Sequence, residues 1–485
     1  MSWSVAGLPA LSAAVSALEA GRTVNILERA PEEDYGGNSR WTGAALRMKS
    51  DSEVSGDFEE FFARNATLNL DPNIIVEVSG EYDSWPAYVK SHPFADPELI
   101  STFASQVPPT IGWLKSFGLR FAKQSSYKFT QDTARVYPDG GGLAIIECLA
   151  AEAKTLGAKT FYRTTATAFL RDNSGRISGV AAVGPHGERC EFPAVSTILA
   201  SGGFQGNSEM LFQYIGQRAR NIRPVARGGY YAKGEGIRMA LAAGAAPAGE
   251  FGSYHAEPLD PRSRQPDPVV FVYPYGVLLD MKGERFLDEA PASVSASSDY
   301  ISRTIADQIN GIAYAIFDAQ VEEIPRWRTC IRSDIPPVEA PTLSELFAKL
   351  GIVVEPALAT IEAFNAACPK AGEFTPFQLD GLATTGLTIR KSNHSRPIVR
   401  APFRAFPIIS GICFTFGGLK VNTNAQVLDQ DAKVISGLYA AGEMVGLYQR
   451  AYTGSTSVLR SAVFGRLAGL HAATVNRSAE APAAS

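Results

Sequence analysis

One segment near the end of the chain opens a helix with residues that suit an anion or an electron-rich ring edge. The apolar run 437–441 stops at Gly442 and Glu443, and small and hydroxyl residues at 453–457 precede a helical pattern over 457–470. The first turn of a helix has N–H groups without intrahelical partners and forms the positive end of the helix dipole. We therefore expect this helix start to bind a phosphate or the edge of a polar ring.

The beginning of the chain carries a matching pattern. Gly7 and Ala10 open an apolar helical pattern that ends near Gly21, and a strand pattern over 23–27 closes on Glu28. In a dinucleotide-binding fold, a Gly-x-Gly-x-x-Gly/Ala turn follows the first strand, and an acidic residue about 20 positions later holds the ribose hydroxyls. Glu28 lies 21 residues after Gly7, at the tip of the second strand.

The glycine half of this motif is incomplete. Val5 stands where the first glycine is expected, and only four residues precede it. Either the chain begins here, with a stub of strand over 2–5, or the start codon is misassigned and upstream residues are missing. We favour the incomplete start, because the rest of the unit is intact. A plain amphipathic helix and strand is a third interpretation.

A glycine pair with hydroxyl and amide residues follows this strand directly. Gly37 lets the backbone approach a flat or anionic ligand, and Asn38, Ser39 and Thr42 supply hydrogen bonds before Gly43. The same letters also occur in ordinary turns. Their position after the acidic strand end gives them weight as part of a nucleotide site.

The composition limits the class of protein. At 485 residues, with 45% apolar and 19% charged residues, the chain is long enough for two or three globular domains. The net charge of −4 does not favour binding to nucleic acid or to an anionic membrane. The five cysteines and five histidines are scattered without a Cys-x-x-Cys spacing. We therefore predict no metal site, and we expect a reducing, cytoplasmic compartment.

We also predict no membrane span. No run of roughly 18 apolar residues occurs. The small apolar segment 6–20 has no preceding Lys or Arg, and its apolar residues repeat at helical spacing. We interpret it as a buried helix rather than a signal sequence.

Changes in composition and in strand and helix patterns along the chain predict an interrupted nucleotide-binding domain. Residues 1–230 form its first part, with a helical region over 55–125, a hairpin over 161–183 and a buried parallel strand at 196–204. Residues 231–400 are richer in prolines and aromatics and are expected to form an α+β insert. Strand patterns there cover 269–275, 276–280 and 312–317, and helical patterns cover 343–350 and 356–366. Residues 401–476 complete the first domain, and 477–485 form a disordered tail.

Seven motifs occur in an order that resembles one family. They are residues 5–11, 27–29, 36–39, 199–204, 283–289, 416–418 and 437–443. The chain is similar over its whole length to flavoproteins of the fumarate reductase/succinate dehydrogenase type. Residues 452–460 resemble the tricarballylate dehydrogenase branch. The resemblance implies an α/β fold, with a Rossmann-like FAD-binding domain of the glutathione-reductase type interrupted by a mobile α+β capping domain.

The resemblance also implies which residues bind FAD. Gly7 and Ala10 would face the pyrophosphate, Glu28 the adenosine ribose, and Ala166 the adenine through its backbone. The remaining FAD residues would be Gly37, Asn38, Ser39, Thr42 and Gly43 near the diphosphate and flavin edge, Ser201 and Gly202 beside the cofactor, and Glu443, Ser457 and Val458 at the ribityl chain and pyrimidine ring.

The substrate-binding positions depart from this family. Fumarate reductases carry a proton-donating arginine in the region that is 291–297 here, and this chain has none there. Phe414 and Tyr452 stand where the family has a carboxylate-binding histidine and arginine. Without these donors a small dicarboxylate would be held poorly. We therefore do not expect fumarate or succinate as the substrate.

Three residues remain as catalytic candidates. His255, similar to the cap-side histidine of the family, would bind substrate or carry a proton, or be a satisfied core residue. Tyr452 would bond or deprotonate the substrate, or only pack beside the flavin. Arg450 would bind one carboxylate, or lie in solvent. Tyr300 and Arg227 are further candidates, whereas Arg285 and Glu289 are expected to pair structurally within the cap.

These observations predict an FAD-dependent dehydrogenase. A hydride would pass from a small oxygenated substrate, either a polycarboxylate or a polyol or secondary-metabolite intermediate, to flavin N5. The electron acceptor would be external: oxygen, a quinone or a redox protein. A reductase of the same fold that acts on an enoate or enone, and a flavoprotein remnant without turnover, are the alternatives.

Overall fold

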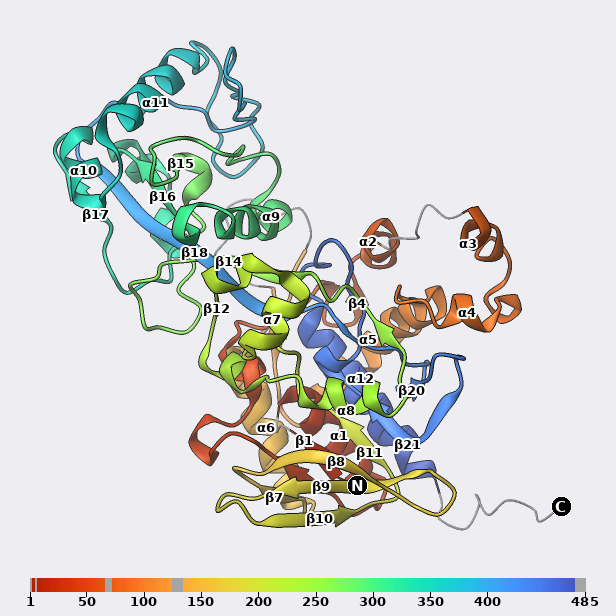
Figure 1. Cartoon of the computed structure of the whole chain (residues 1–485). Helices are drawn as coiled ribbons and strands as arrows, with labels where there is room; N and C mark the ends of the chain where they lie inside the picture. Colours follow the sequence, from red (N-terminus) through yellow and green to blue (C-terminus); the bar gives the residue numbers. More distant parts are fainter. Residues whose placement is uncertain (1, 5–6, 66–71, 124–133, 476–485) are drawn as a thin grey trace.

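The computed structural model describes residues 2–4, 7–65, 72–123 and 134–475 (Figure 1). Val5, at the position of the missing glycine, and the tail predicted over 477–485 lie outside the described residues. The chain folds into a lower body that contains both ends of the described chain and an upper body built from the middle of the sequence (Figure 1).

A six-stranded, mostly parallel sheet forms the centre of the lower body. Its first strand, β1, is the predicted stub and pairs in parallel with both β2 and β11. The neighbouring pairs β2–β7 and β11–β21 are also parallel, and β20 adds an antiparallel edge. In spatial order the strands are β20 (Gln426–Leu428), β21 (Val434–Ala440), β11 (Thr197–Leu199), β1 (Ser2–Ser4), β2 (Asn25–Leu27) and β7 (Lys159–Phe161).

The first and last helices of the described chain pack against each other on one face of this sheet. Helix α1 (Leu8–Glu19) is built largely from small apolar residues and is buried along most of its length. Helix α12 (Ser457–Thr474) carries Gly469 against it, where a Cβ would stand 2.3 Å from the Ala13 carbonyl oxygen. The missing side chain lets the two backbones approach closely. The predicted helix over 457–470 is thereby confirmed, and it lies beside the N-terminal helix.

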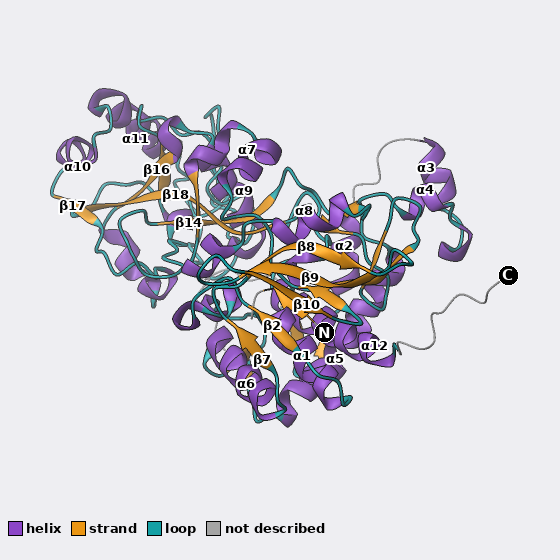
Figure 2. Cartoon of the chain, turned by 60° about the horizontal axis from the view of Figure 1, so that its bottom comes forward, coloured by secondary structure: helices purple, strands orange, loops and turns teal. Residues whose placement is uncertain are grey.

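A three-stranded meander covers the other face of the sheet. The strands β8 (Thr165–Arg171), β9 (Ile177–Val183) and β10 (Arg189–Pro193) are antiparallel. Ala166 and Leu27 belong to one small buried cluster between the two sheets. Figure 2 shows the meander on one side of β2 and β7, with α6 (Gly141–Thr155) and α1 on the other. The predicted hairpin over 161–183 is confirmed as β8–β9.

Helices predicted over 55–125 extend beside this body. They are α2 (Phe58–Asn65), α3 (Pro72–Glu77), α4 (Ala87–Lys90) and α5 (Pro97–Ser116), of which α2 and α5 pack together and α5 also contacts α12. The shorter elements are α7 (Ser208–Ile215), α8 (Glu235–Ala242) and the strand pairs β3–β4 (Met48–Ser50, Glu53–Val54), β5–β6 (Phe121–Ala122, Tyr137–Pro138) and β13–β19 (Pro247–Ala248, Gly418–Leu419). Among the described residues, no helix combines the length and apolarity needed to cross a bilayer.

The upper body is a second sheet with helices packed on it. Its strands are β12 (Ile222–Pro224), β14 (Tyr254–Leu259), β15 (Val277–Leu279), β16 (Ile312–Phe317), β17 (Val338–Ala340) and β18 (Phe403–Thr415). Its helices are α9 (Val294–Ala306), α10 (Leu343–Leu350) and α11 (Val354–Ala367). The predicted α+β character of this region is confirmed.

Two details of the upper body differ from the sequence prediction. The strand predicted over 269–275 is wrong: Val269 and Val270 form only isolated bridges, and a 3-10 turn follows at Tyr273–Tyr275, where Pro274 cannot donate to a strand ladder. The long strand β18, which runs from the upper body toward the lower one (Figure 1), and β12 both join the cap sheet although they lie outside 231–400. We define the cap from here on by this sheet and its helices.

Candidate active site

A cavity of about 220 Å³ lies where the lower body meets the cap. Its wall comes from the loop 38–45, from β14, β18 and α9 of the cap, and from the segment 451–461 that leads into α12. Segments far apart in the sequence therefore meet around one volume. Nine of the residues predicted for binding or catalysis line it: Asn38, Ser39, Thr42, Gly43, His255, Glu443, Tyr452, Ser457 and Val458.

The predicted adenosine-binding residues lie outside this cavity, at the carboxyl edge of the central sheet. Glu28 directly follows β2, is fully buried, and accepts a hydrogen bond from the Ala30 N–H at 2.7 Å. Ala166 lies on β8, which starts just after Thr164, whose N–H donates to the Glu28 carbonyl at 2.9 Å. Gly7 is the residue before α1. The structure thus gathers these residues at the place where a dinucleotide fold holds its nucleotide.

The loop that contains Gly37 to Thr42 is fixed by close backbone contacts. A Cβ on Gly142 would stand 1.9 Å from the Ser39 carbonyl oxygen, and the Gly142 N–H donates to the Thr42 carbonyl at 2.9 Å. The Asn38 amide donates to the Cys413 carbonyl at 2.6 Å. Its buried Oδ1 atom has no hydrogen-bond partner in the described part of the chain. This oxygen is an unsatisfied acceptor on a residue that lines the cavity.

Glu443 connects the end of the central sheet to the cap. Its Oε1 accepts from the Thr415 N–H at 2.8 Å, and its Oε2 accepts from Gln205 at 3.2 Å. Burial raises the pKa of this carboxyl group, against the opposing charge of Arg460. Gly202 lies beside the same carboxylate, and the hydroxyl of Ser201 contacts Met444 Sδ at 3.2 Å. Ser201 and Gly202 therefore lie behind the cavity wall rather than in it.

Tyr452 caps the start of α12. Its hydroxyl oxygen accepts the N–H groups of Thr456 and Ser457, each at 2.9 Å, and lies 2.9 Å from the Ser457 Oγ. Burial raises the pKa of the phenol, so it remains protonated at neutral pH. Tyr452 is therefore an aromatic wall and a helix cap in this arrangement, and nothing in its contacts marks it as a proton acceptor.

His255 lies at the cap end of the cavity in a fixed orientation. Its Nδ1 atom is 3.2 Å from Asp299 Oδ1 on α9, and Asp299 also receives the guanidinium of Arg303 at 2.8 Å. Burial alone would raise the pKa of Asp299, but the hydrogen bond from His255 and the charge of Arg303 outweigh it and hold the pKa below its usual range. The ionised carboxylate leaves the Nε2 side of the imidazole facing the cavity.

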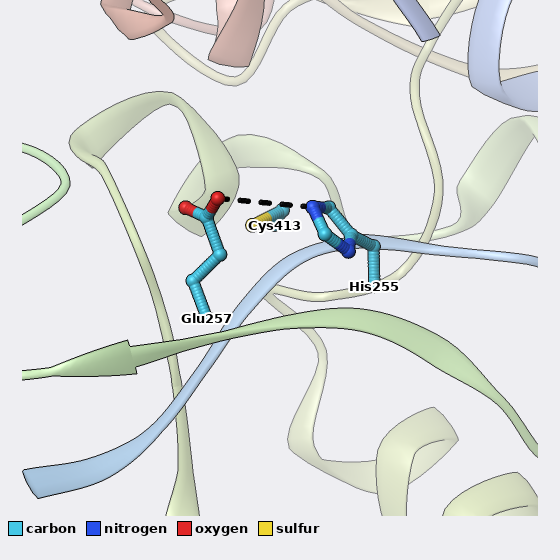
Figure 3. Close-up of side chains that lie close together, drawn as sticks. All are labelled: His255, Glu257 and Cys413. Carbon is cyan, nitrogen blue, oxygen red and sulfur yellow. Dashed lines mark ion pairs between the residues drawn. The ribbon is translucent and has the colours of Figure 1, made fainter. Parts of the chain in front are cut away.

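Two residues that the sequence analysis missed stand beside His255. Glu257 Oε1 lies 3.9 Å from His255 Nε2, and Cys413 completes the group from the neighbouring strand (Figure 3). Burial, followed by the nearby Glu257, raises the pKa of the Cys413 thiol well above its usual value. The pair at 255 and 257 has the spacing of one strand face, which is a weak signal in the sequence. No local pattern pointed to Cys413 or Asp299.

Aromatic rings surround this end of the cavity. The ring of Tyr452 lies 4.4 Å from the His255 ring and 5.0 Å from the Phe414 ring, centroid to centroid. Arg135, an arginine of the cavity wall, donates to the Ser455 hydroxyl at 2.8 Å, and a second, Arg460, donates to the Val445 carbonyl at 3.0 Å. The side chains next to His255 are therefore acidic and aromatic, and the guanidinium of Arg460 lies 5.4 Å from the centre of the Phe414 ring.

The other candidates lie away from the cavity. Arg450 is exposed, and its carbonyl oxygen accepts from Arg303 at 3.0 Å. Tyr300 is 55% exposed on α9. Arg227 is exposed and pairs with Asp34 at 3.0 Å. The structure gives no support to these three as substrate ligands.

The predicted structural pair of the cap is confirmed. Arg285 donates two hydrogen bonds to Glu289, at 2.9 Å and 2.6 Å, and both side chains are buried. This bidentate geometry holds the turn before α9 in place. The pair contributes to the cap structure and does not line the cavity.

The residues present fit FAD. Gly7 gives α1 no side-chain cap, and the first turn of α1 has no acidic residue, so its N–H groups suit a pyrophosphate. Glu28 supplies the buried carboxylate for a ribose, and Asn38 Oδ1 supplies an acceptor without a partner among the described residues. Ser457 and Val458 place a second helix start in the cavity wall.

Comparison with known families decides the assignment. The model of a family described as FAD binding domain matches residues 6–459. The chain belongs to this family. It is an FAD-dependent oxidoreductase, as its motifs predicted, and it is similar to flavoproteins of the fumarate reductase type. Its place in the tricarballylate dehydrogenase branch stays a prediction.

Curated relatives cover nearly all of this chain. It is 26% identical to the vinyl phenol reductase of Lactiplantibacillus plantarum, over 96% of this chain and 94% of that protein. It is 27% identical to the NADH:acrylate oxidoreductase of Vibrio harveyi, over 95% of this chain but only 49% of that protein. The chain therefore spans about half the length of one relative and nearly all of another.

The fold agrees with a solved structure of the same type. The open conformation of a flavocytochrome c3 fumarate reductase superimposes with a TM-score of 0.73, at 23% identity, over 98% of this chain and 78% of that one. This likeness confirms the predicted α/β FAD-binding fold with its inserted cap. It carries no information about the substrate.

Proposed function

We propose that this protein transfers hydride to the carbon–carbon double bond of a small substrate that is activated by an uncharged oxygen-bearing group. The observation that carries the proposal is the cap end of the cavity. There His255 and Glu257 present polar atoms beside the rings of Phe414 and Tyr452. Such a wall suits a carbonyl or hydroxyl oxygen on an apolar skeleton.

The charges at this end disfavour a carboxylate substrate. Glu257 and Asp299 are both buried, and the guanidinium of Arg303 is already used by Asp299. A further carboxylate beside His255 would lie against the like charges of Glu257 and Asp299, and the two arginines of the cavity wall, Arg135 and Arg460, already donate to Ser455 and Val445. The names of the curated relatives support reduction of a double bond, since vinyl phenol and acrylate each contain one. Of these two compounds, acrylate carries a carboxylate and vinyl phenol does not.

Bound FAD, reduced beforehand by an external electron donor, would supply the hydride at its N5 atom, and solvent would supply the proton that the neighbouring carbon takes up. The residues of this chain do the remaining work. His255, oriented by Asp299, donates to the oxygen of the substrate when its Nε2 atom carries a proton, and Glu257 accepts from a substrate hydroxyl; the aromatic rings keep water away from the reacting carbon. Asn38, Ser39, Ser457 and Val458 are proposed to hold the flavin edge, with Glu443 at the ribityl chain. Arg450 and Tyr452 have no assigned step.

Dehydrogenation is the second candidate, because the same geometry serves the reverse transfer. The direction and the substrate class are tested together by anaerobic stopped-flow absorbance. Reduced enzyme is mixed with cyclohexenone or with cyclohexenecarboxylate, and oxidised enzyme is mixed with the saturated ketone. We expect cyclohexenone to reoxidise the flavin at least about tenfold faster than the carboxylate does.

Two results would contradict the proposal. Equal or faster reoxidation by the carboxylate would refute an uncharged substrate. Flavin reduction by the saturated ketone, without reoxidation by cyclohexenone, would show that dehydrogenation is the working direction. A protein that retains no flavin after purification with added FAD would support the remnant without turnover.

A further inference from the structure

Three side chains with different ligand atoms converge at the cap end of the cavity. They are His255, Glu257 and Cys413, and one ligand atom from each lies within 4.8 Å of the others (Figure 3). The imidazole Nε2 and Glu257 Oε1 are 3.9 Å apart. A nitrogen, a carboxylate oxygen and a sulfur therefore surround one point, although the cysteines and histidines are dispersed in the sequence.

The strand pairing explains why these residues meet. His255 and Glu257 are two apart on β14, so both side chains project from the same face. On the partner strand β18, Phe414 pairs with His255 and Ile412 pairs with Ala256, which leaves Cys413 as the extra residue of a bulge. A bulge re-aims a side chain. Two adjacent strands thus hold all three ligand atoms on a rigid support.

The orientation of His255 is the one that metal-binding histidines show. Its Nδ1 atom faces the Asp299 carboxylate at 3.2 Å, and its Nε2 atom faces Glu257. A carboxylate behind the distal nitrogen fixes the tautomer and makes the free nitrogen a better ligand. Asp299 is itself held by Arg303 and by the Ala256 N–H at 2.5 Å. The contacts that orient His255 are therefore in place.

We propose that His255, Glu257 and Cys413 bind one divalent transition-metal ion of the zinc class. The mixture of imidazole, carboxylate and thiolate favours zinc over magnesium or calcium, which prefer oxygen ligands. Zinc–ligand distances of about 2.0–2.3 Å place tetrahedral ligands roughly 3.3–3.7 Å apart, so the His255–Glu257 pair at 3.9 Å needs a small contraction, and Cys413, within 4.8 Å of both, moves toward them as the metal binds. Cys413 loses its proton to solvent as the metal binds.

The fourth coordination position of this metal faces the cavity, since all three ligands line it. Three protein ligands with one open position are typical of catalytic zinc rather than structural zinc. If the proposed function is right, the oxygen of the substrate takes that position and is polarised by the metal. This role rests on the proposed function, whereas the binding site itself rests on the geometry of the three residues.

Metal content tests the site without reference to activity. The full chain, loaded with FAD, is dialysed against zinc and analysed by mass spectrometry of the metal, and cobalt is then substituted and its absorbance recorded. The variants are Cys413→Ser and Glu257→Gln, and the matched control is Cys148→Ser, on α6 outside the cavity. Flavin content and circular dichroism are measured in every sample.

We expect one zinc ion per chain in the wild type and in Cys148→Ser. Zinc affinity should fall at least about tenfold in Cys413→Ser and Glu257→Gln, with flavin content unchanged. The thiolate-to-cobalt absorbance should disappear in Cys413→Ser. A wild type that binds no zinc, or Cys413→Ser and Glu257→Gln variants that bind it as tightly, would overturn the site.

The same samples separate this inference from the proposed function. Zinc binding without turnover of any activated alkene would leave the metal site standing and remove the function. Turnover of cyclohexenone by metal-free protein would leave the function standing and remove the catalytic role of the metal, and it would show that the three side chains contact the substrate oxygen directly.

Discussion

Gly465 of α12 lies so close to Pro9 of α1 that a Cβ on the glycine would stand 2.4 Å from the Pro9 carbonyl oxygen. This contact brings the N-terminal helix, which starts at the proposed pyrophosphate site, against the C-terminal helix, whose start borders the cavity. The cofactor site therefore depends on how closely these two helices pack.

Replacement of Gly465 by alanine should loosen this packing. Because the added methyl group meets backbone rather than a flexible side chain, we expect a loss of about 1–3 kcal/mol in the free energy of unfolding, together with weaker FAD binding. Chemical denaturation and a fluorescence titration with FAD measure the two effects. Gly112→Ala is the control, since nothing lies within 4 Å of its added methyl group and α5 should gain about 0.5–1 kcal/mol.

The Gly7→Ala variant should bind FAD more weakly without losing stability in the absence of FAD. Its φ of −78° suits any residue, and the added Cβ would meet the Gly36 carbonyl oxygen at an ordinary 3.5 Å. The melting temperature without FAD should therefore stay near that of the wild type. FAD affinity should fall at least about tenfold, which is about 1.4 kcal/mol, because the methyl group stands where the pyrophosphate approaches. Unchanged affinity would mean that the cofactor does not use the start of α1.

The ammonium group of Lys420 binds a buried carboxylate and two backbone carbonyl groups in the segment just before α5. Its ammonium group donates to the carbonyls of His92 and Phe94 at 2.8 Å and 2.7 Å, and to Asp96 at 2.9 Å. Lys420→Met leaves Asp96 buried without its cation, so we expect a loss of about 3–5 kcal/mol. The double variant Lys420→Met with Asp96→Asn should recover part of it. Denaturation of both variants checks this, and no recovery would show that the carbonyl contacts dominate.

His394 should make the cap less stable in mild acid. Burial lowers its pKa from 6.5 to about 4, against the opposing charge of Asp380. Between pH 6.5 and 4 the unfolded chain binds a proton that the folded chain does not, so stability falls as the pH falls. The loss is at most about 3 kcal/mol across this window.

His394→Asn removes this titration while keeping a residue that tolerates the positive φ of 57°. Urea denaturation at several pH values should show a flatter profile for the variant than for the wild type between pH 6.5 and 4. Parallel profiles would show that another group is responsible for the acid sensitivity.

Much of the fold was predictable because the decisive signals are local. The strand end at Glu28 and the helix start at Ser457 follow from apolar periodicity and from the residues that interrupt it. The boundary of the cap was less predictable. The strand β18 continues from the cap toward the lower body. The sequence of a long apolar strand does not indicate which of two sheets the strand joins.

The sequence predicted which segments meet around the proposed FAD half of the site, and it predicted the cap end only in part. His255 was found through a family resemblance, whereas Cys413 reaches it only through a bulge in a strand far along the chain. Asp299 comes from a helix that crosses the cap sheet. Such contacts depend on strand register and helix placement, which single-residue patterns do not encode.

The most direct measurement of the central claim is the electron density of a crystal grown with FAD. The account predicts the pyrophosphate at the start of α1, the ribose at Glu28, and the isoalloxazine ring in the cavity between Asn38 and Ser457, with His255 across from it. Density for the ring anywhere outside that cavity, or for the pyrophosphate away from Gly7, would contradict it.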